Sequence, residues 1–403
     1  MRIPYAQAVY GKKEVRAMMR VFENPSKIVA GPAVKQFERA IATLFGKKHG
    51  VMVNSGSSAN LIAFEVLDLP RGSEIITPAL TFSTTLAPII QKGLVPVFVD
   101  VEPGTYVIDV RRIEPLITKR TRALMIPSLI GNLPDWARLK TIADRHQLWL
   151  IEDSCDTLGA RFNKRPTGFY SHISTTSFYA SHIITAAGGG GMACFHDAGL
   201  ARRARLKAYW GRESTLFGSY EKSEELVRRF AGVLGGEPYD AKFIFSEVGY
   251  NFQPAEAPAA FGLVQLARLK EFGARRRAHF RELAKFFAGY EKIFVLPRSM
   301  KGTATNWLAF PLTIRNGAGF SRHALTRYLE EHNIQTRPIF TGNVLRQPAF
   351  RQIEQKRAAR GGYPVTDHIM KNGFLIGCHQ GLTARHLSYM KATMNDFLKS
   401  YGR

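Results

Sequence analysis

Short apolar runs alternate with segments of helical spacing along the first two thirds of the chain. Runs rich in Val, Ile and Leu predict strands at residues 49–54, 74–77, 95–99, 123–127, 148–151 and 175–179. Apolar positions three and four apart predict helices at residues 15–22, 33–45, 61–67, 135–145 and 255–272. Strands that are apolar on both faces and separated by helices are typical of a parallel sheet, so the pattern predicts an α/β fold.

The C-terminal third has its own alternation, with a strand predicted at residues 306–314 and a helix at 322–331. A chain of 403 residues exceeds what one ordinary hydrophobic core organises. We therefore expect a large domain at residues 1–265 and a small α/β domain at residues 266–403, with the boundary near the helix predicted at 255–272.

Composition narrows the class of protein. The chain is 45% hydrophobic and 22% charged, which is typical of a globular protein and excludes a disordered one. No apolar run reaches the roughly 18 residues of a membrane helix, and the first residues lack the apolar core of a signal peptide. The three cysteines, Cys155, Cys194 and Cys378, are far apart, which argues against a disulfide framework and leads us to expect a cytoplasmic protein.

The net charge of +24 admits three interpretations. Lys and Arg could neutralise nucleic-acid phosphates, attract an anionic substrate such as a nucleotide sugar, or form a solvated basic surface. The basic residues are spread along the chain and no nucleic-acid motif accompanies them, which disfavours the first interpretation. Charge alone does not choose between the other two.

Two strand ends carry candidate chemistry. The strand at 49–54 runs into Gly56, Ser57 and Ser58 and then into a helix, a design that lets backbone N–H groups bind phosphate, although an ordinary capped helix has the same pattern. The strand at 148–151 ends at Asp153, at the sheet edge where α/β proteins bind ligands; a helix cap is the simpler alternative. Four glycines at 188–191 predict an irregular segment that a ligand or another chain approaches closely.

The segment at 174–194, STTSFYASHIITAAGGGGMAC, resembles the active-site segment of the DegT/DnrJ/EryC1/StrS family of PLP-dependent sugar aminotransferases. The family motif is SFHxxK followed by a G-E-G-G turn, and its lysine holds the cofactor covalently. Here SFYASH places His182 at the lysine, and the turn begins Ala187-Gly188-Gly189-Gly190. The GSSA, EDSCD, GYN and TRPIFTGNVLRQP segments extend the resemblance from about Ile3 to the C-terminus.

The resemblance implies fold type I of the PLP enzymes, with a mostly parallel seven-stranded sheet in the large domain, and a role for each motif residue. Asn251 would reach the cofactor phosphate of a neighbouring subunit, which implies a homodimer. Phe82 would stack on the cofactor ring, although a core phenylalanine is the default without the resemblance. The implied cofactor-binding residues are Gly56, Ser57 and Ser58 for the phosphate, Phe82 for the ring, Asp153 for the pyridine nitrogen, Asp156 for the phenolic oxygen, Ser177, and Asn251.

Histidine in place of lysine marks the sugar 3-dehydratase branch of this family. An imidazole forms no stable covalent link to PLP but exchanges protons near neutral pH. The resemblance implies that PLP or PMP is held noncovalently, that glutamate donates the amino group, and that His182 is the base in removing the C3 hydroxyl of a nucleotide 4-keto-6-deoxy sugar. No metal is implied, because the loop at 212–238, where some relatives hold an iron–sulfur cluster, contains no cysteine. An aminotransferase and a noncatalytic regulator remain alternatives.

Overall fold

A seven-stranded sheet forms the centre of the computed structural model, which describes residues 2–24, 28–218, 222, 224–353 and 361–401. The spatial order is β1-β9-β8-β5-β4-β2-β3. Five neighbouring strands are parallel, and β9 runs antiparallel to both of its neighbours. The strands are β1 (His49–Val53), β2 (Glu74–Pro78), β3 (Val95–Val99), β4 (Thr121–Pro127), β5 (Trp149–Asp153), β8 (Ile173–Ser177) and β9 (Gly191–Phe195). This confirms the predicted mostly parallel sheet.

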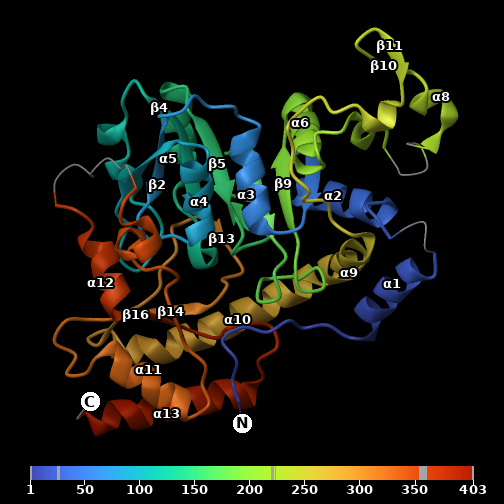
Figure 1. Cartoon of the computed structure of the whole chain (residues 1–403). Coiled ribbons are helices and arrows are strands. Elements are labelled where there is room, and N and C mark those ends of the chain that lie inside the picture. The colour runs from blue at the N-terminus through green and yellow to red at the C-terminus, as the bar shows by residue number, and fades with distance from the viewer. Residues whose placement is uncertain (1, 25–27, 219–221, 223, 354–360, 402–403) are drawn as a thin grey trace.

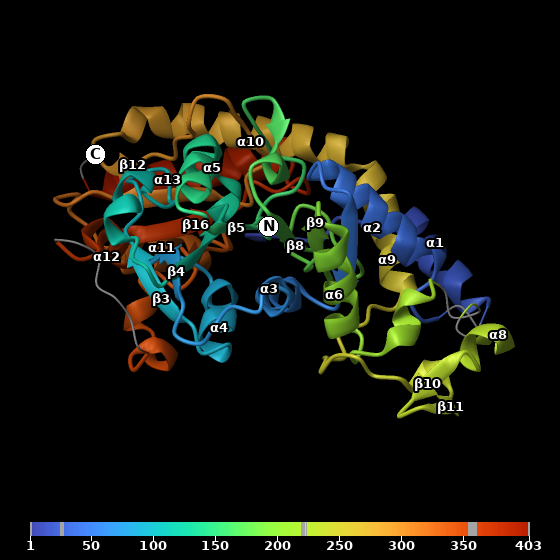
Figure 2. The same cartoon turned by 90° about the horizontal axis from the view of Figure 1, so that it is seen from above.

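Helices cover both faces of this sheet, with α3, α4 and α6 on one side and α5 on the other (Figure 2). Successive strand residues point to opposite faces, so Ile75 packs with the first group and Ile76 with α5. The helices of this part are α1 (Lys12–Phe22), α2 (Pro32–Leu44), α3 (Gly56–Glu65), α4 (Ser83–Gln91), α5 (Trp136–Arg145), α6 (Ala198–Ala208), α8 (Leu226–Arg229) and α9 (Glu256–Ala267).

A second, antiparallel sheet lies in the C-terminal part, with the order β12-β14-β16-β15 (Figure 1). Its strands are β12 (Phe294–Val295), β14 (Phe310–Ile314), β15 (Arg337–Pro338) and β16 (Gly373–Ile376). It packs with α10 (Leu269–Phe287), α11 (Arg322–Glu331), α12 (Pro364–Asn372) and α13 (Ala384–Ser400) in one hydrophobic cluster. The α/β class is therefore confirmed, whereas the domain boundary between residues 265 and 266 stays a prediction.

Short strands complete the fold. β6 (Arg161–Phe162), β7 (Arg165–Pro166) and β13 (Thr303–Ala304) form a three-stranded sheet, and β10 (Gly232–Leu234) and β11 (Glu237–Tyr239) form a hairpin. The hairpin and α8 stand off the body of the molecule, at the upper right of Figure 1. No helix among the described residues has the length and apolar composition needed to cross a membrane.

Several predicted elements have different bounds in the structure. The helix predicted at 61–67 lies at Gly56–Glu65, and the helix predicted at 255–272 is divided at Arg268, whose N–H bonds to the carbonyl of Gln265 in a tighter turn between α9 and α10. The strand predicted at 306–314 begins only at Phe310, and the strand predicted at 175–179 lies at Ile173–Ser177. In these two strands the apolar pattern continues beyond the residues whose backbone pairs with a neighbour.

The prediction that all four glycines lie outside regular structure is wrong for Gly191, which is buried and begins β9. A Cβ atom on Gly191 would lie 2.2 Å from the carbonyl oxygen of Ser55. The glycine is needed because β9 and the turn before α3 approach at backbone distance. The close approach is thus to another segment of the same chain.

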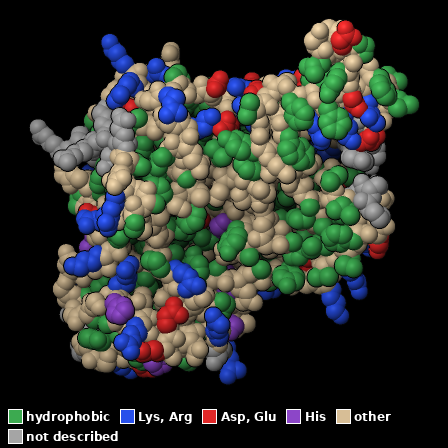
Figure 3. Space-filling model, in the orientation of Figure 1, with side chains coloured by type: hydrophobic (Ala, Val, Ile, Leu, Met, Phe, Trp, Pro, Cys, Tyr) green, Lys and Arg blue, Asp and Glu red, His purple; other side chains and the backbone are tan. Residues whose placement is uncertain are grey.

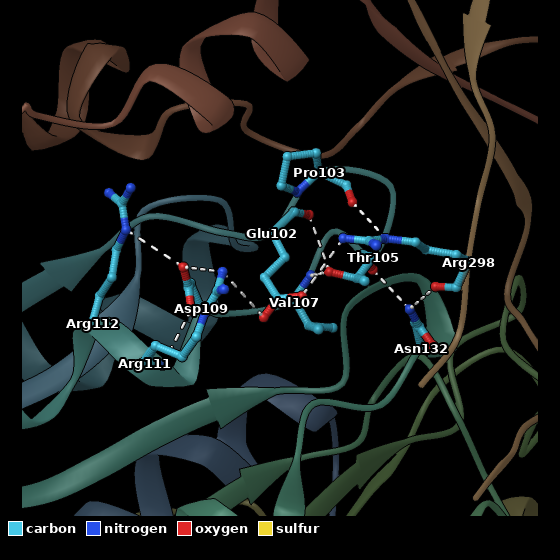
Figure 4. Close-up of polar contacts among 9 residues, drawn as sticks. All are labelled: Glu102, Pro103, Thr105, Val107, Asp109, Arg111, Arg112, Asn132 and Arg298. Carbon is cyan, nitrogen blue, oxygen red and sulfur yellow. Dashed lines mark hydrogen bonds and ion pairs between the residues drawn. The ribbon is translucent and has the colours of Figure 1, made fainter. Parts of the chain in front are cut away.

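Hydrogen bonds connect loops beside the large sheet with the C-terminal part of the chain (Figure 4). Asn132 donates from Nδ2 to the carbonyl oxygens of Thr105 (2.9 Å) and Arg298 (3.0 Å), and Arg298 Nε donates to the carbonyl of Pro103 (3.0 Å). Nearby, Asp100 at the end of β3 accepts hydrogen bonds from the first turn of α12. These bonds tie the C-terminal part to the carboxyl edge of the large sheet.

Candidate active site

The start of α3 meets the ends of β5 and β8 at the carboxyl edge of the large sheet. Ser55 caps the helix by accepting a hydrogen bond from the Ser58 N–H (3.1 Å). The N–H group of Ser57 has no hydrogen-bond acceptor among the described residues, and Gly56 directly follows the parallel bridge between Ser55 and Gly190. A Cβ on Gly56 would lie 2.6 Å from Cβ of Ser177 and 2.9 Å from Sγ of Cys155. Free N–H groups at a helix start, on a backbone without a side chain, can bind an anion.

Asp153, the last residue of β5, is a buried carboxylate with a full set of donors. Its Oδ2 accepts from Asn60 Nδ2 (2.9 Å) and Thr85 Oγ1 (2.7 Å), and its Oδ1 accepts from the N–H of Cys155 (3.1 Å). Hydrogen bonds from donors favour an ionised carboxylate. The predicted alternative of a simple helix cap does not describe it, because two of the three donors are side chains of α3 and α4.

Asp156 lies one turn further along, and its carboxylate accepts a hydrogen bond from the N–H of Ile130 (2.8 Å). Burial raises the pKa of Asp156 to about 7, and the nearby charge of Asp153 acts in the same direction. Ile130 adopts φ 59°, a left-handed conformation that is costly for a β-branched residue. The backbone is held there by tertiary contacts, among them the bond from the Leu308 N–H to the Ile130 carbonyl (2.8 Å).

His182 occupies a tight turn after β8. Its N–H donates to the carbonyl of Tyr179 (3.0 Å), and the Tyr179 N–H donates to Oγ of Ser177 (3.2 Å). Part of the imidazole is accessible, but Nδ1 is buried and has no hydrogen-bond partner among the described residues. Burial, and secondarily the charge of Arg276, lower the pKa of His182 to about 4. The side chain is therefore a neutral imidazole at physiological pH.

Phe82 precedes α4 and is 48% exposed, which excludes the alternative that it is a core residue. Its ring meets Phe340 edge to face, with the centroids 5.9 Å apart. Two residues later, Thr84 Oγ1 accepts a hydrogen bond from Ser57 Oγ (3.0 Å), which links the start of α4 to the start of α3. The exposed ring and the free helix start thus belong to one part of the surface.

A model of the DegT/DnrJ/EryC1/StrS aminotransferase family matches residues 9–395. The chain belongs to this family. Fold and family predicted from the sequence are both confirmed. Ala187, which stands where the family motif has its first glycine, adopts φ 54°, while Gly188 and Gly190 adopt φ 100° and 118°. Ala187 thus adopts a left-handed conformation that a glycine would adopt at lower cost.

Relatives within the family are named as sugar 3-dehydratases. The dTDP-4-dehydro-2,6-dideoxy-D-glucose 3-dehydratase of Saccharopolyspora spinosa is 37% identical over 92% of this chain and 81% of its own. The GDP-4-keto-6-deoxy-D-mannose 3-dehydratase of Yersinia pseudotuberculosis is 30% identical over 94% and 95%. A solved GDP-4-keto-6-deoxymannose-3-dehydratase with a trapped PLP-glutamate geminal diamine has a TM-score of 0.85 at 27% identity, covering 97% of this chain and 99% of that one.

Asn251, the asparagine of the family's GYN triplet, lies next to the segment that leads into α3. It is exposed and forms an antiparallel bridge with Tyr209, on the segment that leads from α6. The Phe252 carbonyl accepts a hydrogen bond from the N–H of Asn54 (3.0 Å), just before the helix start. Within the described residues the Asn251 side chain makes no hydrogen bond to Asp153, His182 or the α3 turn.

Several residues of the site had not been predicted from the sequence. Asn60 lies in the GSSAN turn and Thr85 follows Phe82, so their proximity to known motif residues was a usable signal. Tyr5 and Arg276 gave none, because they come from distant segments. Burial and the nearby Asp156 raise the pKa of Tyr5, which places the N-terminal segment beside the site. No group of three or more His, Cys, Asp or Glu side chains in the described ranges is arranged to hold a metal ion.

Proposed function

We propose that this chain is a PLP/PMP-dependent sugar 3-dehydratase that removes the C3 hydroxyl from a nucleotide-linked 4-keto-6-deoxy sugar. The observation that carries the proposal is His182, a neutral imidazole in the turn after β8, at the family's lysine position. The names of the 3-dehydratase relatives support the same reaction class. The high positive net charge also fits this proposal, because it would attract an anionic nucleotide sugar.

The side chains at the sheet edge fit the proposed cofactor. The N–H groups of Gly56 and Ser57, with the Ser57 and Ser58 hydroxyls, would bind its phosphate. Asp153 offers an anion to the pyridine nitrogen, and Phe82 offers an exposed ring face beside it. Ser177 lies against Gly56, next to the proposed phosphate site. When bound, the cofactor supplies an amino group and an electron sink.

Each of the ionisable residues at the site has a separate proposed role. His182 accepts and returns a proton through its accessible ring edge, because its neutral form dominates above about pH 4. Asp153 would hold the ring nitrogen of the bound cofactor, and Asp156, which can hold a proton near neutral pH, would contact its phenolic oxygen. Without a lysine in the turn at 178–190, the chain cannot displace an amino product through a covalent link.

With the cofactor bound, the sugar would lose one oxygen atom, and the cofactor would supply the electron pair and the amino group that is released as ammonia. Glutamate would supply the next amino group, in line with the glutamate adduct named in the solved neighbour. We propose a homodimer in the cytoplasm, in which Asn251 of each chain serves the other chain's site.

The test combines the protein with PLP, glutamate and a panel of nucleotide 4-keto-6-deoxy sugars. We expect free ammonia and, by mass spectrometry, a product lighter than the substrate by one oxygen atom. His182→Asn should bind PMP, read by its absorption spectrum, but release no ammonia. His182→Lys should gain a PLP adduct after borohydride reduction and lose the deoxygenation.

Two outcomes would contradict the proposal. A 4-amino sugar formed by the unmodified protein without ammonia would make it an aminotransferase. Cofactor binding with no turnover of any sugar in the panel would favour a noncatalytic regulator. A borohydride adduct on a lysine of the unmodified protein would show that the cofactor is held covalently after all.

A further inference from the structure

Arg276, in the middle of α10, is a fully buried arginine without a carboxylate partner among the described residues. Its Nη1 donates to the carbonyl oxygens of Trp307 and Leu308, both at 3.0 Å, and its Nη2 donates to the carbonyl of His182 at 3.4 Å. Its Nε donates to Oε1 of Gln380 at 2.6 Å. Every acceptor is neutral, so the guanidinium charge is not compensated by an anion. A buried charge of this kind is costly and acts strongly on its surroundings.

Gln380 extends this contact to the next residue of the turn. It is buried, and its Nε2 donates to the carbonyl of Ile183 at 3.4 Å. Arg276 and Gln380 therefore hold the carbonyls of two consecutive residues, His182 and Ile183, while they bond to each other. Both come from the C-terminal part of the chain, from α10 and from the segment after β16. The turn after β8 in the large sheet is therefore held by side chains of the C-terminal part of the chain.

The groups around the imidazole leave Arg276 as its dominant charge. Tyr179 lies edge to face with His182, with ring centroids 6.0 Å apart, and Nδ1 has no partner in the described chain. Around Arg276 lie Tyr5, Cys378 and His379. Burial raises the pKa of Tyr5 and of Cys378, the latter to about 12, and lowers the pKa of His379 to about 3. At neutral pH these three groups are uncharged and do not offset the guanidinium.

We propose that Arg276 and Gln380 form a positioning pair that fixes the His182 turn, and that the uncompensated charge of Arg276 adds to burial in keeping the imidazole neutral. The inference rests on the proposed role of His182 as a base. It assigns part of that role an electrostatic origin, because a positive neighbour disfavours a second positive charge on the ring. The arrangement is the reverse of a base whose ring is paired with a carboxylate, which favours the protonated form.

The test is the titration of His182 by NMR on protein with ¹⁵N-labelled imidazoles, assigned by comparison with His182→Asn. In the unmodified protein His182 should stay neutral down to about pH 5. Gln380→Glu keeps an acceptor for Arg276 and supplies the missing anion, so it should raise the titration midpoint by about one pH unit or more. Arg276→Gln removes the charge and should do the same. Arg276→Lys keeps the charge and should leave the midpoint low.

The matched control is Arg275→Gln, on the neighbouring residue, whose exposed guanidinium pairs with Glu271 (3.2 Å). It should not move the midpoint. The titration needs no substrate, so it can fail or succeed independently of the proposed reaction. A midpoint near 6.5 in the unmodified protein would overturn the inference, and so would folded Gln380→Glu and Arg276→Gln variants with unchanged midpoints.

Discussion

At the scale of single residues, the site contains an ionisable pair with different environments. Asp153 has three donors on its two oxygens, whereas Asp156 accepts one described hydrogen bond, from the Ile130 N–H, and its pKa is raised to about 7. Two carboxylates this close in chain and space cannot both be equally well stabilised as anions. In the structure, most of the hydrogen-bond donors lie around Asp153 rather than around Asp156. The raised pKa of Asp156 suits a group that carries a proton near neutral pH in an acid–base site.

This division predicts a pH-dependent stability for Asp156→Asn. A carboxyl whose folded pKa is raised binds more protons in the folded than in the unfolded state between about pH 4 and pH 7, so its contribution to stability is lost as the pH rises through that window. The asparagine carries no charge and can still accept from Ile130. We expect the variant of the cofactor-free protein to be more stable than the unmodified protein by about 1–3 kcal/mol at pH 8 and unchanged at pH 4.

Urea unfolding at the two pH values measures this difference. If the variant were equally stabilised at both pH values, the charge of Asp156 would not be the cause of the stabilisation. Asp144→Asn is a suitable control, because its exposed carboxylate pairs with Lys140 on the surface of α5. Its effect should stay within about 0.5 kcal/mol.

The sequence could predict the candidate chemical residues but not the residues that support them. Asp153 ends an apolar strand, which can be recognised locally, and Asp156 and His182 belong to short motifs that resemble those of the family. Tyr5, Arg276 and Gln380 contact the same site from segments that are far away in the sequence. Nothing in a local pattern distinguishes Arg276 from Arg275 and Arg277 beside it. Only the packed helix shows which of the three is buried.

At the scale of elements, the site depends on how closely β9 passes the start of α3. Hydrogen bonds and a parallel bridge join Gly190 to Asn54 and Ser55, and β9 pairs with both β1 and β8. The alternation of strands and helices predicted this layered sheet. It predicted no strand at residues 191–195, and strand direction depends on whether the connection crosses over or turns back. The connection at residues 178–190 turns back from β8 to β9, and His182 lies in it.

Gly191→Ala tests this close approach. The added Cβ would lie 2.2 Å from the Ser55 carbonyl oxygen, so the helix start or the strand must move. We expect a loss of about 1–3 kcal/mol in unfolding free energy. Because the same movement displaces the proposed phosphate site, we also expect weaker PMP binding in a spectroscopic titration. Gly189→Ala is the matched control, since its Cβ would meet its nearest atom at 3.8 Å. Equal effects of the two substitutions would refute the argument.

At the scale of the whole molecule, apolar side chains remain exposed on the segment at 226–248. This segment, the arm, carries α8 and the β10–β11 hairpin and stands off the body at the upper right of Figure 3. Exposed apolar clusters of this kind mark interaction surfaces. Its exposed members are Leu226, Val227, Phe230, Val233, Leu234, Tyr239, Phe243, Phe245 and Val248. Asn251 follows shortly after and is exposed, as expected if a second chain covers this side.

The proposed exchange of Asn251 between chains can be tested with mixed dimers. An Asn251→Ala homodimer should bind PMP about tenfold more weakly or worse, because a hydrogen bond to a charged phosphate is lost.

A dimer of one Asn251→Ala chain and one His182→Asn chain distinguishes the two possible arrangements. If Asn251 serves the neighbouring site, one of the two sites has both native residues, and about half of the native ammonia release should return. If Asn251 serves its own site, both sites are damaged and the ammonia release stays no higher than that of the Asn251→Ala homodimer. Differently tagged chains allow the mixed dimer to be purified, and a purified protein that is monomeric and fully active would exclude any role for the second chain.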